Sequence, residues 1–135
     1  MPMIFVNYWA ILVAAIASMV IGTLWYGPFF AKAWMQELGK KESDLSQNAM
    51  MSMYGLTLIG SLVMSYVMAY VVGYAMATTA VTGGITGFWV WLGLIVPTML
   101  SLKLFENRSW KLFAINTGYY LVTLVVMGMI FAAWH

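Results

Sequence analysis

The sequence predicts an all-α integral membrane protein, a bundle of four transmembrane helices with a short interfacial amphipathic helix after the first span. Of its 135 residues, 64% are hydrophobic and 7% are charged, whereas soluble domains carry about 25% charged residues. Four apolar segments reach the roughly 20 residues that a helix needs to cross a bilayer. No segment alternates like a transmembrane β-strand. These observations exclude a soluble enzyme, a disordered chain and a nucleic-acid-binding protein.

The first span is predicted over residues 4–26. It begins without the Lys or Arg of a signal peptide, and its apolar run of about 23 residues is longer than a typical signal-peptide core. We therefore expect a retained helix. Gly27 and Pro28 end this helix, because proline cannot donate the next helical hydrogen bond.

Residues 29–38 are predicted to form the interfacial helix. Its apolar side comprises Phe30, Trp34, Met35 and Leu38, and its polar side comprises Lys32, Gln36 and Glu37. This pattern is typical of a helix that lies flat at the membrane surface, although a plain loop is the alternative. Ser43 or Asp44 is then expected to cap the second span.

The other spans are predicted over residues 48–76, 81–104 and 110–134, so residues 1–135 form a single transmembrane domain. Pro97 lies inside the third span and is expected to kink it. The kink is either a moving hinge or a static bend. A Trp-x-Gly motif followed by proline occurs at both 25–27 and 91–93, which suggests a duplicated two-helix hairpin.

The charged residues predict the orientation of the spans. Eight of the ten lie in the connection between the first and second spans or between the third and fourth, Lys103 and Lys111 lie at the span ends beside the latter, and the connection between the second and third spans has none. Lys and Arg concentrate on the cytoplasmic side of membrane proteins. We therefore expect a multi-pass protein of the bacterial inner membrane, with charged loops in the cytoplasm and both termini outside.

Small residues recur every four positions and predict close helix packing, which replaces the hydrophobic effect within lipid. The first two rows comprise Ala10, Ala14, Ser18 and Gly22, and Ser61, Ser65, Ala69, Gly73 and Ala77. The later spans carry Gly83 with Gly87 and Gly128 with Ala132. These rows pack within the chain or, alternatively, form a subunit interface, and we expect a homo-oligomer.

The sequence offers little for catalysis or metal binding. No ionisable side chain lies in the middle of a span, which argues against proton-coupled transport. There is no cysteine, and His135 is the only histidine, so we expect no metal site, no cofactor and no enzymatic activity.

Neutral polar residues in the spans are the remaining candidates for a site. Tyr66, Tyr70 and Tyr74 form one row, and Asn116, Tyr119, Tyr120 and Thr123 form a polar segment in the fourth span. They predict a pocket, with Tyr66, Tyr70, Tyr74, Asn116 and Tyr120 as its ligand-binding residues. The protein would bind or pass a neutral or lipid-like small molecule. Alternatively, these groups only tie helices together, and the protein is an accessory subunit that packs through its small-residue grooves.

The sequence also resembles a known family. The run from Gly22 to Phe30, which contains Trp-Tyr-Gly-Pro at 25–28, and the later runs at 87–93, 105–110 and 116–120 are similar to the bacterial membrane family catalogued as domain of unknown function 1761. The resemblance covers nearly the whole chain. It implies a small multi-span membrane protein and carries over no catalytic residue.

Overall fold

The computed structural model describes residues 6–38 and 47–134, and this part of the chain is helical with no β-strand. Within it, four helices are long and apolar enough to cross a membrane: Tyr8–Phe29, Met51–Tyr74, Ala80–Glu106 and Trp110–Ala133. They confirm the all-α fold class and the four spans. The cap predicted at Ser43 or Asp44 lies outside the described residues, as does His135.

The spans are divided into shorter elements. In chain order these are α1 (Tyr8–Leu24), η1 (Trp25–Phe29), α2 (Ala31–Leu38), α3 (Gln47–Tyr74), α4 (Ala80–Val90), η3 (Trp91–Ile95), α5 (Val96–Glu106) and α6 (Trp110–Ala133). Here η3 is a single π-helical turn, whereas η1 is a kink at Gly27, whose backbone angles (φ −107°, ψ −106°) are not helical. The predicted interfacial helix is α2, with Lys32 and Gln36 exposed and Trp34 and Met35 half-buried against the bundle.

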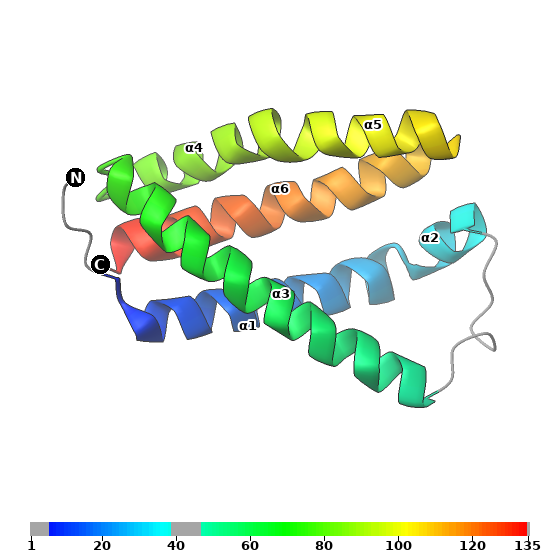
Figure 1. Ribbon diagram of the computed structural model, residues 1–135, viewed down its shortest axis with the longest axis horizontal. Coiled ribbons are helices and arrows are strands. Elements are labelled where there is room, and N and C mark those ends of the chain that lie inside the picture. Colours follow the sequence, from blue (N-terminus) through cyan, green and yellow to red (C-terminus); the bar gives the residue numbers. More distant parts are fainter. Residues whose placement is uncertain (1–5, 39–46, 135) are drawn as a thin grey trace.

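Helix α6 is the central element of the bundle, because α1, α3 and α4 all pack against it. Figure 1 shows the chain termini at one end of the bundle, with α2 and the turn between α5 and α6 at the other. We name the latter the charged end, since its residues include Lys32, Lys103, Arg108 and Lys111.

The packed core lies toward the end that holds the termini. Its buried residues are Ala10, Ile11, Ala14, Met68, Ala69, Val72, Leu124, Met127, Phe131 and Ala132. By contrast, every residue of α3 from Met51 to Gly60 is exposed. The bundle is therefore closed at one end and splayed at the charged end, where α3 crosses away from α1 (Figure 1).

The small-residue rows lie inside the chain's own packing. Ala14 and Ser18 of α1 and Ser65 of α3 are almost fully buried. The Ser65 hydroxyl donates to the carbonyl of Ile11 at 2.7 Å, which joins α3 directly to the backbone of α1. Only a small side chain at these positions lets the two helices approach this closely.

The α4–α6 crossing depends on glycine. A Cβ atom added at Gly83 would overlap the backbone of Gly128, and one added at Gly87 would overlap the carbonyl of Leu124. The two helices therefore touch backbone to backbone, in the way that paired small residues permit in membranes.

Both irregular turns begin at a tryptophan, and a proline lies within the first (Pro28) and just after the second (Pro97). The Phe30 N–H donates to the Trp25 carbonyl at 2.9 Å, and the Val96 N–H donates to the Trp91 carbonyl, in each case five residues back. Pro97 lies in the first turn of α5, directly after η3. The helix is thus irregular at the predicted position, and a moving hinge there stays a prediction.

Candidate functional site

Two tryptophans, one in the first span and one in the third, bond to the half of α6 that lies at the charged end. The indole Nε1–H of Trp25 donates to the carbonyl of Ile115 at 2.8 Å. That of Trp91 donates to the carbonyl of Thr117, also at 2.8 Å. These are the tryptophans of the repeated Trp-x-Gly motif, so the two copies share an irregular turn and an indole bond to the backbone of α6.

The first span and α6 also each place an aromatic ring against a glycine of the other. The ring of Trp25 lies over Gly118, and the ring of Tyr119 lies over Gly22, where its nearest atoms are 3.4 Å from the position of an added Cβ. The Tyr119 hydroxyl donates to the carbonyl of Ser18 at 3.0 Å. Each glycine leaves room for the ring opposite it, and the pair fixes the position of α6 along α1.

A row of aromatic rings continues from this contact toward α2. The ring centroid of Tyr26 lies 5.2 Å from that of Trp34 and 5.5 Å from that of Tyr119, and Tyr119 lies 5.0 Å from Tyr120. We call these four residues the aromatic wall. The Tyr26 hydroxyl donates to Oδ1 of Asn116 at 2.7 Å. Asn116 therefore ties η1 to α6, which is the helix-tying alternative that its sequence position left open.

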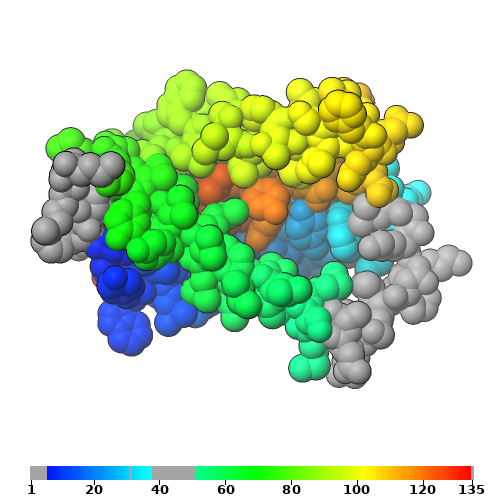
Figure 2. All heavy atoms as spheres, in the orientation of Figure 1, coloured from blue at the N-terminus to red at the C-terminus, as the bar shows by residue number. Residues whose placement is uncertain are grey.

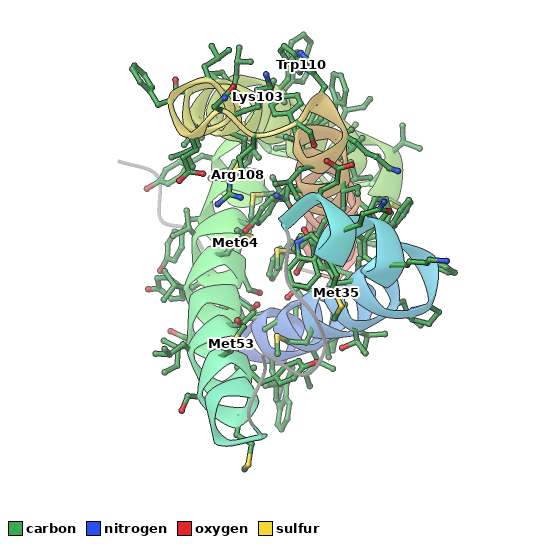
Figure 3. The ribbon with its side chains drawn as sticks, turned by 90° about the vertical axis from the view of Figure 1, so that its right-hand side faces the viewer. Met35, Met53, Met64, Lys103, Arg108 and Trp110 are labelled. Atoms are coloured by element: carbon green, nitrogen blue, oxygen red, sulfur yellow. The ribbon has the colours of Figure 1, made fainter. Side chains whose placement is uncertain are left out.

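A cavity of about 360 Å³ lies against the aromatic wall. Its lining residues are Met19, Gly22, Thr23, Tyr26, Trp34, Met35, Met53, Tyr54, Thr57, Tyr119 and Tyr120. Figure 2 shows the molecule hollowed beside α3, where α6 and α1 come into view behind it. Figure 3 looks at the charged end and shows Met35 of α2 and Met53 of α3 on opposite sides of the space between these helices.

The cavity exists because α3 is anchored to α1 at one end only. The bond between Ser65 and Ile11 holds the two helices together near the core. Toward the charged end, a Cβ added at Gly55 or Gly60 of α3 would meet no atom within 4 Å. The helices therefore diverge, and α2 folds back across the opening.

The lining offers an apolar, aromatic surface with a few uncharged polar groups. Among the described residues that line the cavity, none is acidic or basic. Four of their hydroxyls already donate within the chain: those of Thr23, Tyr26, Thr57 and Tyr119. The hydroxyl of Tyr120 makes no hydrogen bond to the described residues and is half-buried. The described part of the lining therefore combines an apolar, aromatic surface with a few uncharged polar groups, as small-molecule sites commonly do.

The structure separates the residues that the sequence grouped as a ligand site. Tyr120 lines the cavity, and Asn116 adjoins it through Tyr26. The tyrosine row lies farther along α3, where the Tyr66 hydroxyl donates to that of Tyr70 at 3.3 Å. Tyr70 is about 20 Å along α3 from Thr57, at 1.5 Å per residue. The row and the polar segment of α6 therefore do not share this cavity.

Sequence reasoning missed most of the cavity. The sequence pattern gives Tyr26 no role in a site, and it places Trp34 and Met35 on the apolar side of an interfacial helix. The available signal was that this apolar side follows directly after a Gly-Pro break. Such a break turns the helix back, so its apolar side can face the bundle as readily as lipid.

The described charged side chains of this end are not among the residues that line the cavity. Arg108 Nε is 3.8 Å from Glu106 Oε2 in an exposed pair, and Lys103 Nζ lies 4.0 Å from the ring centroid of Trp110. Figure 3 shows Lys103 and Trp110 at the edge of the molecule away from Met35 and Met53, with Arg108 nearer to Met64 of α3. Among the described residues, no three His, Cys, Asp or Glu side chains are grouped as metal ligands.

Comparison with known proteins agrees with the resemblance seen in the sequence. A family model described as "Protein of unknown function (DUF1761)" matches residues 9–132. No curated protein and no solved structure matches the chain. The match spans all four membrane-spanning helices, the aromatic wall and both tryptophans, and on this evidence the chain belongs to the family of unknown function DUF1761.

Proposed function

We propose that this protein binds a neutral, lipid-like small molecule in the cavity against the aromatic wall. The observation that supports the proposal is the lining itself, which in the described part of the chain has five aromatic rings, three methionines and no charged side chain. Small-molecule sites are mostly apolar hollows of about 300–1,000 Å³ with a few placed polar groups. We further propose that the charged end faces the cytoplasm of a bacterial inner membrane, with both termini outside.

The distribution of polar groups supports an amphiphile over a purely apolar ligand. Tyr26 and Tyr119 keep acceptor lone pairs after donating their protons, and the Tyr120 hydroxyl can both donate and accept. These groups lie at one side of the cavity on a single wall. A molecule with an uncharged hydroxyl-bearing head would satisfy them while its apolar part contacts Met19 and Met53.

The alternative of an accessory subunit has less support. The small-residue rows that would receive a partner are covered by the chain's own helices, as the burial of Ala14, Ser18 and Ser65 shows. A partner would have to use a different surface. The homo-oligomer likewise stays a prediction, and the same mass measurement that detects a retained ligand reports the number of subunits.

Native mass spectrometry and a binding titration test the proposal. The purified protein is titrated in mild detergent with a monoacylglycerol and, as the matched anionic compound, with a lysophosphatidic acid of the same chain. We expect saturable binding of the monoacylglycerol only. Tyr120→Phe should weaken it roughly three- to tenfold, the value of one hydrogen bond, whereas Tyr66→Phe, outside the cavity, should not. Absence of saturable binding, or equal binding of both compounds, would overturn the proposal.

A further inference from the structure

A second hollow lies next to the cavity, between α1 and α3 on the outer surface of the bundle. Its volume is about 420 Å³, and its lining residues are Ile16, Met19, Val20, Thr23, Leu24 and Leu58. We call it the lateral groove. Apart from the hydroxyl of Thr23, which donates to the carbonyl of Met19, its lining side chains are apolar.

The lateral groove and the cavity share a boundary. Met19 and Thr23 line both of them, and the other residues of each belong to one side only. Methionine is unbranched and adapts its shape readily. The boundary is thus formed by one flexible side chain and one small one, on the face of α1 from which α3 diverges.

Along the shared boundary, α1 and α3 are in contact toward the core and separate toward the charged end. Toward the core it is closed where the Ser61 hydroxyl contacts the sulfur of Met19 at 3.7 Å and where Ser65 bonds to Ile11. Toward the charged end, α3 has no neighbour at Gly55. The gap between α1 and α3 therefore widens from the core toward the charged end.

We propose that the ligand is a single-chain amphiphile that enters laterally from the bilayer. Its uncharged head lies against the aromatic wall, and its chain passes between α1 and α3, across Met19 and Thr23, into the lateral groove. This inference rests on the proposed function and adds the ligand's class and its route. The groove residues from Ile16 to Leu24 extend about 12 Å along α1, so the chain lies along the helix.

The alkyl chain of the ligand determines where the molecule lies more than how tightly it binds. Lipid tails are as apolar as the groove, so moving an alkyl chain from the bilayer into the groove gains little from the hydrophobic effect. Affinity then depends mainly on the head group, and the chain decides where the molecule lies. For this reason the decisive measurement is where the chain sits, and chain length should affect affinity only weakly.

Photo-crosslinking locates the chain directly. The full-length protein in lipid nanodiscs is irradiated with a monoacylglycerol that carries a diazirine in the middle of its chain, and labelled residues are identified by mass spectrometry. We expect labels on Val20, Leu24 and Leu58 that excess unlabelled monoacylglycerol removes. Leu92 and Leu94, which are exposed on the third span, should show only labelling that the competitor does not change.

A variant whose larger side chain fills the lateral groove tests the route of the alkyl chain. Leu58→Trp should reduce competable mid-chain labelling by roughly tenfold, because overfilling a packed site costs about that much. Binding of glycerol monobutyrate, which has the same head and a short chain, should not change. The control is Leu56→Trp, on the same helix but outside the groove and 71% exposed, which should leave both measurements unchanged.

The outcomes separate this inference from the proposed function. If the monoacylglycerol binds saturably but its chain labels α5 or α2 instead of the groove, the lateral route is wrong and the proposed function stands. The same conclusion follows if Leu58→Trp and Leu56→Trp have equal effects. If neither the long-chain nor the short-chain compound binds saturably, the proposed function itself is wrong.

Discussion

The indole of Trp25 lies directly over Gly118, with Cζ2 of the ring 2.9 Å from the position that a Cβ atom on this glycine would occupy. The same indole donates to the carbonyl of Ile115, three residues earlier on α6. The glycine and the tryptophan therefore form one contact: the absence of a side chain on α6 lets the indole reach the backbone.

Gly118→Ala should destabilise the protein by about 1–3 kcal/mol, the usual cost of overfilling a packed site. The added methyl group displaces the ring of Trp25 and lengthens its hydrogen bond to Ile115. Thermal unfolding in detergent measures the effect as a lower Tm. Gly93→Ala is the control, since a Cβ there meets nothing within 4 Å and alanine favours a helix by about 1 kcal/mol. Equal Tm values for the two variants would contradict the packing described for Trp25.

Gly83→Leu should prevent α4 from packing on α6. A Cβ at this position already overlaps the backbone of Gly128, so no rotamer of leucine relieves the conflict and the helices must separate. We expect loss of the monodisperse peak in size-exclusion chromatography, or a Tm lowered by more than in Gly118→Ala. Gly55→Leu, on an open face of α3, should elute as the unmodified protein does. A monodisperse Gly83→Leu protein with unchanged Tm would show that the α4–α6 contact is wrong.

The proposed orientation can be tested with single cysteines, because the sequence contains none. Met76, 84% exposed between α3 and α4, and Lys111, exposed at the start of α6, lie at opposite ends of the bundle. A maleimide that does not cross membranes should label Met76→Cys in intact cells and Lys111→Cys only after permeabilisation, because positive loops stay in the cytoplasm. The reverse pattern would invert the orientation, and labelling of both in intact cells would contradict a fixed one.

The sequence predicted what depends on composition and spacing along one helix. The four spans follow from apolar length, and the four-residue spacing of Gly83 and Gly87 marks a face where another backbone approaches. The cavity was not predictable in this way, because it depends on the angle at which α3 leaves α1. That angle depends on where the contacts between the two helices end, at Ser61 and Ser65. The sequence of either helix taken alone does not reveal this point.

The hydrogen bonds of the tryptophans were also beyond sequence reasoning. Trp91 begins a π-helical turn and Trp25 begins the kink at Gly27, and in both a backbone bond spans five residues. A π-helical turn adds one residue to the turn and rotates the side chains that follow relative to those before. Positions counted at 3.6 residues per turn therefore misplace the residues around η1 and η3, which is where Tyr26 and the aromatic wall begin.

The last prediction concerns how proline places Trp91. Pro97 has no N–H, so the Gly93 carbonyl receives no helical bond from it, and the Val96 N–H instead donates to the carbonyl of Trp91. If this arrangement aims the indole at Thr117, then Pro97→Ala and Trp91→Phe disturb the same bond. Each single variant should cost about 0.5–1.5 kcal/mol.

The double variant tests whether the hydrogen bond of Trp91 depends on Pro97 or forms independently of it. When two changes act on one interaction, their combined cost is smaller than the sum, by about 0.5 kcal/mol or more, and we expect this shortfall for Pro97→Ala with Trp91→Phe. The reference pair is Pro97→Ala with Trp25→Phe, since the Trp25 indole bonds to Ile115 from η1, in the first span. Those two costs should add, because Pro97 has no part in placing Trp25. Additive costs in both pairs would mean that the indole of Trp91 reaches α6 independently of the proline.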